Sequence, residues 1–244
     1  MMDTRVRRTG VAACLAVGGA LLLLAGCASR PCPHAAAASA ATAQTHFATP
    51  RALVTALIAA CRADDTAALV AIVGADNAAL VRSGDAAADR AQCQRFVTAA
   101  AAMTRLDPAG PDRLVLVVGS DDYPVPVPLV RDAQGWRLDT DAGAAEILRR
   151  SVGANELRAI QTSRAFAAGA SLPARASGYA YRALGGPGAA LVAAPLEYRR
   201  SGVMTFVVAQ DGRVYEKDLG ADTTTLAARL SGAAPDASWK PVTN

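Results

Sequence analysis

The chain has 244 residues, of which 52% are apolar and 19% charged, so it is long enough to bury a core and is not disordered throughout. Alanine makes up about a quarter of it and aromatic residues only 5%, which predicts a core of small aliphatic side chains. The formal net charge is +4 and the basic residues do not cluster with aromatic residues, so we expect no nucleic-acid binding. Two lysines and two histidines leave few candidates for a Schiff-base lysine or a catalytic histidine.

The first 26 residues have the pattern of an export signal. Three arginines precede an almost purely apolar run, Val11 to Leu24, of about fourteen residues. This run is shorter than the ~20 residues of a membrane-spanning helix, and no second apolar run of that length follows, so no transmembrane helix is expected after processing. The segment from Leu24 to Cys27 resembles a bacterial lipobox, in which the final cysteine receives a diacylglycerol.

That resemblance implies removal of residues 1–26 and a mature protein that begins at Cys27, held in the membrane by acyl chains such as palmitate. Ala28 stands where an inner-membrane retention signal would place aspartate, which favours the periplasmic face of the outer membrane. The cell surface and the inner membrane stay open. The alternative is an ordinary signal peptide with a chance cysteine at the cleavage point.

The mature chain divides by composition into a tether and two folded regions. Residues 27–46 are small, proline-punctuated and of low complexity, which predicts a flexible tether. His34 and His46 lie in it or at its end, so no histidine is expected in the folded part. An α+β domain is expected over residues 47–168, and a β-meander region with a closing helix over residues 178–243.

Apolar periodicity, caps and turn residues predict the elements in chain order. The first domain is expected to contain helices over 50–62, 66–73, 78–82 and 86–105, strands over 114–118, 125–130 and 136–139, and helices over 144–150 and 155–168. After a breaker-rich loop over 169–177, the second region is expected to contain strands over 179–184, 189–194, 203–209 and 214–217 and a helix over 223–230.

Alternating prolines at 124, 126 and 128 remove N–H donors from a single edge of a strand. We interpret this segment as an edge strand protected against aggregation. A ligand for a proline-recognition domain is the alternative.

Two fold resemblances follow from this order of elements. Helices followed by a meander that ends in a Gly-Trp strand resemble the α+β arrangement of nuclear transport factor 2-like domains. The second region, in which a Gly-Tyr strand leads into hairpins, is similar to the sheet of type II pseudopilins. The pilin-type N-terminal helix is absent, so filament assembly by that route is not expected. The expected class is α+β, with N-terminal helices packed on an antiparallel meander and a second antiparallel region after it.

Several motifs together resemble the bacterial family catalogued as domain of unknown function 2950. They are Phe47 to Pro50, Val117 to Pro124, Trp136 to Thr140, Asn155 to Leu157, Ser201 to Phe206, Gln210 to Gly220 and Asp236 to Trp239. The resemblance covers residues 46–243 and implies an exported, often lipid-anchored envelope protein. It implies no catalytic residues. The chain departs from the family pattern at residues 168–178, where members usually have a longer segment.

Five cysteines give a disulfide prediction. Cys14 lies in the signal, Cys27 at the lipidation position and Cys32 in the tether, whereas Cys61 and Cys93 lie in register with the apolar faces of two helices. We therefore expect a Cys61–Cys93 bridge in an oxidising compartment. Two buried free thiols are the alternative, and a zinc site lacks both CxxC spacing and a histidine in the folded part.

Four aspartates are the candidates for chemistry. Asp121 and Asp122 follow one predicted strand, and Asp139 and Asp141 follow another, so all four are expected at one end of a sheet. Carboxylates gathered in this way bind Ca²⁺ or act as acid and base. The alternative is solvated turn residues and a helix cap.

Two functions follow. The first is a non-catalytic envelope lipoprotein that binds an envelope protein partner or a small apolar ligand and needs no cofactor or metal. The second is a carboxylate-dependent envelope hydrolase or isomerase.

Overall fold

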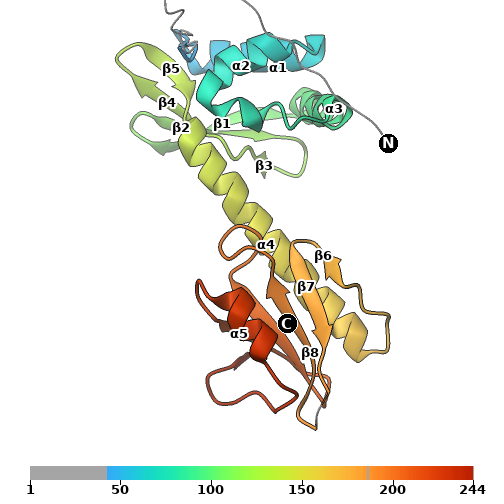
Figure 1. Cartoon of the computed structure of the whole chain (residues 1–244). Coiled ribbons are helices and arrows are strands. Elements are labelled where there is room, and N and C mark those ends of the chain that lie inside the picture. The colour runs from blue at the N-terminus through green and yellow to red at the C-terminus, as the bar shows by residue number, and fades with distance from the viewer. Residues whose placement is uncertain (1–42, 186, 244) are drawn as a thin grey trace, which may run out of the picture. The chain divides into compact units, whose positions relative to one another are not determined.

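The computed structural model describes residues 43–185 and 187–243, so Cys14, Cys27, Cys32 and His34 lie outside the described residues. The described chain is α+β, with a group of helices ahead of the first of two separate antiparallel sheets and a long helix between the two sheets, which confirms the expected class (Figure 1). The helices are α1 Pro50–Ala63, α2 Thr66–Val73, the 3-10 helix η1 Ala75–Leu80, α3 Ala86–Ala102, α4 Thr140–Ala167 and α5 Thr223–Arg229. No helix among the described residues has the length and apolar character needed to cross a membrane.

The first sheet has the strand order β1-β2-β4-β5, with β3 paired to β2. Its strands are β1 Thr104–Gly110, β2 Arg113–Val118, β3 Tyr123–Pro124, β4 Leu129–Asp132 and β5 Gly135–Leu138. The second sheet has the order β11-β10-β9-β8-β7-β6. Its strands are β6 Arg175–Ala176, β7 Tyr179–Ala183, β8 Ala189–Pro195, β9 Met204–Ala209, β10 Val214–Asp218 and β11 Lys240–Pro241.

Local signals set the ends of α1. The Thr49 hydroxyl accepts a hydrogen bond from the Ala52 N–H, and Pro50 occupies the first helical position. At the other end, Asp64 takes a left-handed conformation with φ of 55° and closes the helix. The helix therefore begins and ends close to the predicted positions.

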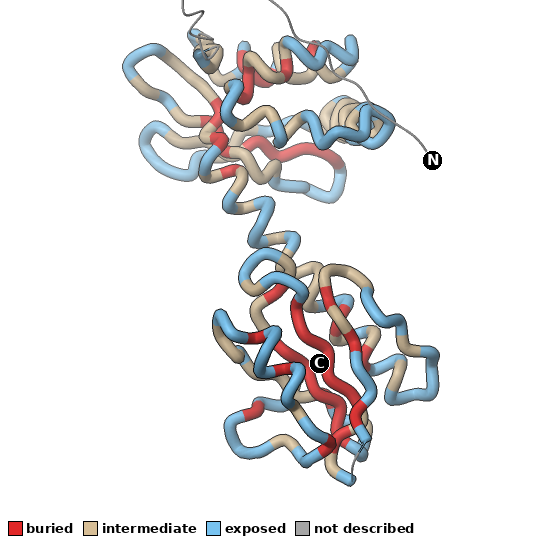
Figure 2. The backbone as a smooth tube through the Cα atoms, in the orientation of Figure 1, coloured by how far each residue is buried: buried red, intermediate tan, exposed pale blue. Residues whose placement is uncertain are grey.

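The first core lies between α1, α2 and the first sheet (Figure 2). The helices contribute buried aliphatic side chains, and the strands β2, β4 and β5 contribute the opposite wall. The buried members are Leu53, Val54, Ala60, Leu69, Ile72, Val73, Leu116, Val118, Leu129 and Leu138.

Helix α3 ends three residues before the predicted end, and the strand β1 follows it, which the sequence analysis missed. β1 pairs with β2 from Thr104 opposite Val118 to Gly110 opposite Arg113. Its own side chains are exposed or half-buried, so its strand conformation depends on hydrogen bonds to β2 and not on an apolar alternation. Pro108 is tolerated because β1 is an edge strand.

The proline segment is shorter as a strand than predicted. Only Tyr123 and Pro124 pair with β2, the Val125 N–H donates to the Leu116 carbonyl at 2.8 Å, and the chain then bends before β4 begins at Leu129. Because proline has no N–H donor, this segment cannot form the continuous ladder of backbone hydrogen bonds that its apolar residues suggest.

One continuous helix, α4, replaces the two predicted helices at residues 144–150 and 155–168. The Asp139 carboxylate caps it by accepting from the Ala142 N–H. Gly153 inside the helix lowers helix propensity by about 1 kcal/mol relative to alanine, which packing at both ends of α4 outweighs.

The four long strands of the second sheet lie within a residue or two of the predicted ranges. One face carries Tyr179, Tyr181, Leu191 and Phe206 and packs against the C-terminal half of α4 around Ala159. The other face carries Val192 and Val207 and packs against α5 and Trp239. The second sheet is thus covered on both faces.

Candidate functional site

The four candidate aspartates do not come together. β4 lies between β2 and β5 and is antiparallel to both, so β5 is parallel to β2. Leu129 of β4 pairs with Leu114 near the start of β2 and with Leu138 at the end of β5, so the end of β5 lies level with the start of β2. Asp139 therefore contacts Arg113 at the start of β2, whereas Asp121 and Asp122 follow its last residue. Strand residues rise by about 3.3 Å each, so a strand length separates the two pairs. The expectation of a common sheet end is wrong because the strands are staggered.

Three of the four aspartates have a structural partner. Asp122 accepts from Arg105 at 2.7 Å, Asp139 accepts from Arg113 at 2.8 Å and caps α4, and Asp141 accepts from the Asn77 amide at 3.2 Å. Within the described residues, no group of three or more histidine, cysteine or acidic side chains is arranged to hold a metal ion. These positions fit the alternative of solvated turn residues and a helix cap. The two pairs of aspartates do not form the common site that a carboxylate-dependent mechanism was expected to use.

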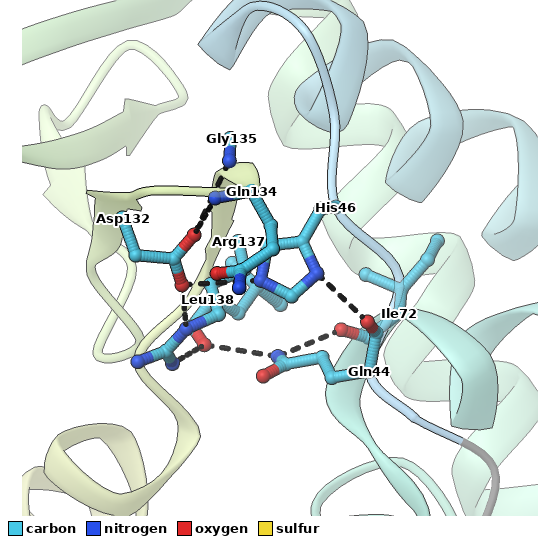
Figure 3. Close-up of polar contacts among 8 residues, drawn as sticks. All are labelled: Gln44, His46, Ile72, Asp132, Gln134, Gly135, Arg137 and Leu138. Carbon is cyan, nitrogen blue, oxygen red and sulfur yellow. Dashed lines mark hydrogen bonds and ion pairs between the residues drawn. The ribbon is translucent and has the colours of Figure 1, made fainter.

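Residues 44–46 are part of the folded domain, although the sequence analysis placed them in the tether (Figure 3). The Gln44 side-chain amide donates to the Ile72 and Leu138 carbonyls at 3.0 and 2.9 Å, and the Thr45 N–H donates to Ala71. The expectation that the folded part contains no histidine is therefore wrong for His46. The composition of residues 44–46 does not indicate that they are folded, because their partners are backbone carbonyls and side chains far along the chain.

The two ring nitrogens of His46 face the Asp132 carboxylate at 3.1 Å and the Gln44 carbonyl at 3.0 Å. Partial burial acts to raise the pKa of Asp132, but hydrogen bonds from Arg137, His46 and the Gln134 N–H outweigh it and lower the pKa to about 2. A catalytic triad would need a nucleophile at the ring nitrogen opposite the carboxylate, and a backbone carbonyl occupies that place. His46 therefore fastens the start of the domain and does not form a triad.

Glu146 on α4 provides a pH-dependent contribution to stability. Hydrogen bonds from Arg149 and Arg150, at 2.7 to 2.8 Å, lower its pKa from 4.5 to about 2. Because the folded-state pKa lies below the unfolded value, this contribution is present above about pH 4.5 and is lost as the pH falls toward 2. We expect Glu146→Gln to reduce the difference between urea midpoints measured at pH 6 and pH 2.5. Glu197→Gln, which removes a carboxylate paired only with exposed Arg200, is the control; equal effects of the two variants would contradict the assignment.

The strongest candidate site is an apolar cavity of about 240 Å³ in the first domain. It lies between α1, α2, η1 and α3 on one side and β2, β4, β5 and the 125–127 segment on the other. Asp89 is the one charged residue among the described residues that line it, and its carboxylate already accepts three hydrogen bonds from Ser83. The lining residues are Leu53, Leu57, Cys61, Leu69, Val73, Ala79, Leu80, Val81, Ser83, Asp89, Gln92, Cys93, Phe96, Leu116, Val125, Pro126, Val127, Leu129, Leu138 and Ile147.

A second hollow, beside α4, contains three arginines but is a weaker candidate. Arg113 is paired with Asp139, and Arg149 and Arg150 are both paired with Glu146. These guanidinium groups already have carboxylate partners, so the hollow presents little unpaired positive charge to an anion.

The predicted disulfide is present: Cys61 of α1 and Cys93 of α3 are bonded, with their Cα atoms 5.0 Å apart. Both cysteines also line the apolar cavity. The sequence analysis identified the bridge but not the cavity. The bridge was predictable because each cysteine lies in register with the apolar face of its own helix. The cavity was not, because its wall combines residues from several helices and strands.

The motif residues of α4 hold the loop between β8 and β9. One Glu156 oxygen accepts from the Val203 and Met204 N–H groups at 2.8 and 3.0 Å, and Asn155 donates to the Ser201 carbonyl at 3.0 Å. Burial, and next to it the charge of Glu156, hold the pKa of Tyr179 well above its usual range, so its hydroxyl stays a donor. These motif residues have structural roles in the second region.

Comparisons with known proteins and protein families identify the family of this chain. A search of curated proteins and a search of solved structures each found no match. The family model described as "Protein of unknown function (DUF2950)" matches residues 44–172 and 167–242. These segments span most of the chain, including the cavity and the Glu156 contacts. The chain therefore belongs to the DUF2950 family.

Proposed function

We propose that this protein is a non-catalytic cell-envelope lipoprotein whose first domain binds a small uncharged apolar ligand. The observation that carries the proposal is the cavity, because its wall is mostly apolar and its one charged side chain, Asp89, already accepts hydrogen bonds from Ser83. Small-molecule sites are concave and mostly apolar, with a few polar groups. The cavity with its Ser83, Asp89 and Gln92 polar groups fits that description.

The size of the cavity sets the size of the ligand. An apolar cavity of roughly 150 Å³ holds one benzene, so each ligand atom takes about 25 Å³. At about 240 Å³ the cavity fits a ligand of roughly ten non-hydrogen atoms. Asp89 disfavours anionic ligands such as fatty acids, since its negative charge lies on the wall. Naphthalene is therefore a suitable probe.

We expect naphthalene to bind saturably, with chemical-shift changes confined to cavity residues in NMR titrations. Ala79→Trp places a large ring at an exposed position of the cavity lining and should weaken binding at least tenfold. Ala75→Trp adds the same ring in η1 at an exposed position that does not line the cavity, and should leave binding unchanged. Absence of saturable binding, or equal losses in both variants, would refute the proposal.

The lipid anchor is the second part of the proposal and rests on the lipobox at Cys27, which lies outside the described residues. We expect Cys27→Ser to move the protein out of the membrane fraction or to leave it as unprocessed precursor, because the acylated thiol is lost. Fractionation with intact-mass measurement checks this. Ala28→Ser, which keeps the cysteine, is the control, and unchanged fractionation of Cys27→Ser at normal mass would exclude the anchor.

A further inference from the structure

Helix α3 forms one wall of the cavity but has no fully buried residue. In its N-terminal half, residues 86–95, only Asp89, Ala91 and Cys93 are less than exposed. Of this half, Cys93 is the side chain that packs against the first core. A helix is normally held by a buried apolar stripe, and this half of α3 lacks one.

The other contacts of this half are weak or local. Arg90 pairs with Asp64 at 2.7 Å, but both side chains are about half exposed, and such surface pairs contribute little. The Asp89 contacts to Ser83 join residues only six positions apart and do not reach α1. The Cys61–Cys93 bond therefore provides the main attachment of this half to α1.

The C-terminal half of α3 is held differently. Phe96, Ala99 and Ala100 pack against the core, and the Gly119 N–H donates to the Ala99 carbonyl at 3.1 Å. Loss of the disulfide should therefore release residues 86–95 while the rest of the helix stays in place. Because Asp89, Gln92 and Cys93 lie on the cavity wall, that release would open the cavity.

We infer that the Cys61–Cys93 disulfide is a redox latch that sets the ligand affinity of the cavity. A dithiol attacks the bond through a mixed disulfide, the protein gains two electrons and two protons to give two thiols, and the dithiol leaves as a cyclic disulfide. The oxidised protein keeps a closed wall, and the reduced protein has a mobile one. The affinity part of this inference rests on the proposed function.

The test uses the chain from residue 27 onward with Cys27→Ser and Cys32→Ser, so that the bridge supplies its only cysteines. Hydrogen exchange by mass spectrometry and naphthalene titration are measured before and after dithiothreitol treatment. We expect reduction to raise exchange over residues 86–95 at least tenfold, to leave α1 and the first sheet protected, and to weaken naphthalene binding at least fivefold. A further Cys61→Ser/Cys93→Ser change should reproduce the reduced state without reductant.

The outcomes separate the two proposals. If the oxidised protein binds no naphthalene, the proposed function fails, and the exchange data still test the latch. Unchanged exchange over residues 86–95, or loss of protection throughout the first domain, would overturn the latch. Unchanged affinity despite local release would overturn its control of the cavity. Asp64→Asn, which removes the Arg90 ion pair and keeps the disulfide, should change neither measurement.

Discussion

Gly202→Ala is expected to destabilise the second region by about 3 kcal/mol or more, because the added methyl group has no space. A β-carbon at this position would lie 2.6 Å from Cζ and 2.7 Å from Cε2 of Tyr179, and closer still to its hydroxyl oxygen. The ring is fully buried, its hydroxyl donates to the Met204 carbonyl at 2.8 Å, and its centroid lies 5.8 Å from that of Phe206. It therefore cannot move aside.

Urea denaturation of the purified variant measures this effect, and Gly153→Ala is the matched control. Gly153 lies in α4, where an added β-carbon meets no atom within 4 Å, so the same substitution should stabilise the helix by roughly 0.5 to 1 kcal/mol. The two Gly→Ala changes should thus have opposite signs. Equal stability of Gly202→Ala and the unmodified protein would show that the Tyr179 ring has room to shift.

The second sheet was predictable because its signals are local. Strands β7 to β9 are short and largely apolar, and turn residues bound them, such as Gln210 to Arg213 between β9 and β10. The strand β1 was missed because its residues show no apolar alternation and its pairing partner β2 determines its conformation. The order of the strands in each sheet depends on such pairings, which composition does not encode.

The candidate site shows the same division. The disulfide was predictable because Cys61 and Cys93 each continue the apolar face of a helix. The carboxylate cluster was wrong because strand order without register does not say which ends meet. Contacts between distant segments were the hardest to predict, as with His46 and Asp132, which are 86 positions apart.

Leu129→Ala is expected to lower the free energy of unfolding by about 2 to 5 kcal/mol and to enlarge the ligand cavity. Leu129 is fully buried in β4 and lines the cavity, so its truncation removes buried methyl groups and leaves space behind. The removed side chain corresponds to about three more ligand atoms, which brings biphenyl within the size limit.

Leu191→Ala is the matched control for this prediction. Leu191 is equally buried but lies in the second region, away from the cavity, so its truncation should cost a similar amount of stability. Because a ligand that binds only the folded state raises the melting temperature, saturating biphenyl should stabilise Leu129→Ala and leave Leu191→Ala unchanged. Equal responses of the two variants to biphenyl would mean that it does not bind in the cavity, whereas a response confined to Leu129→Ala ties the volume beside β4 to the ligand that the domain accepts.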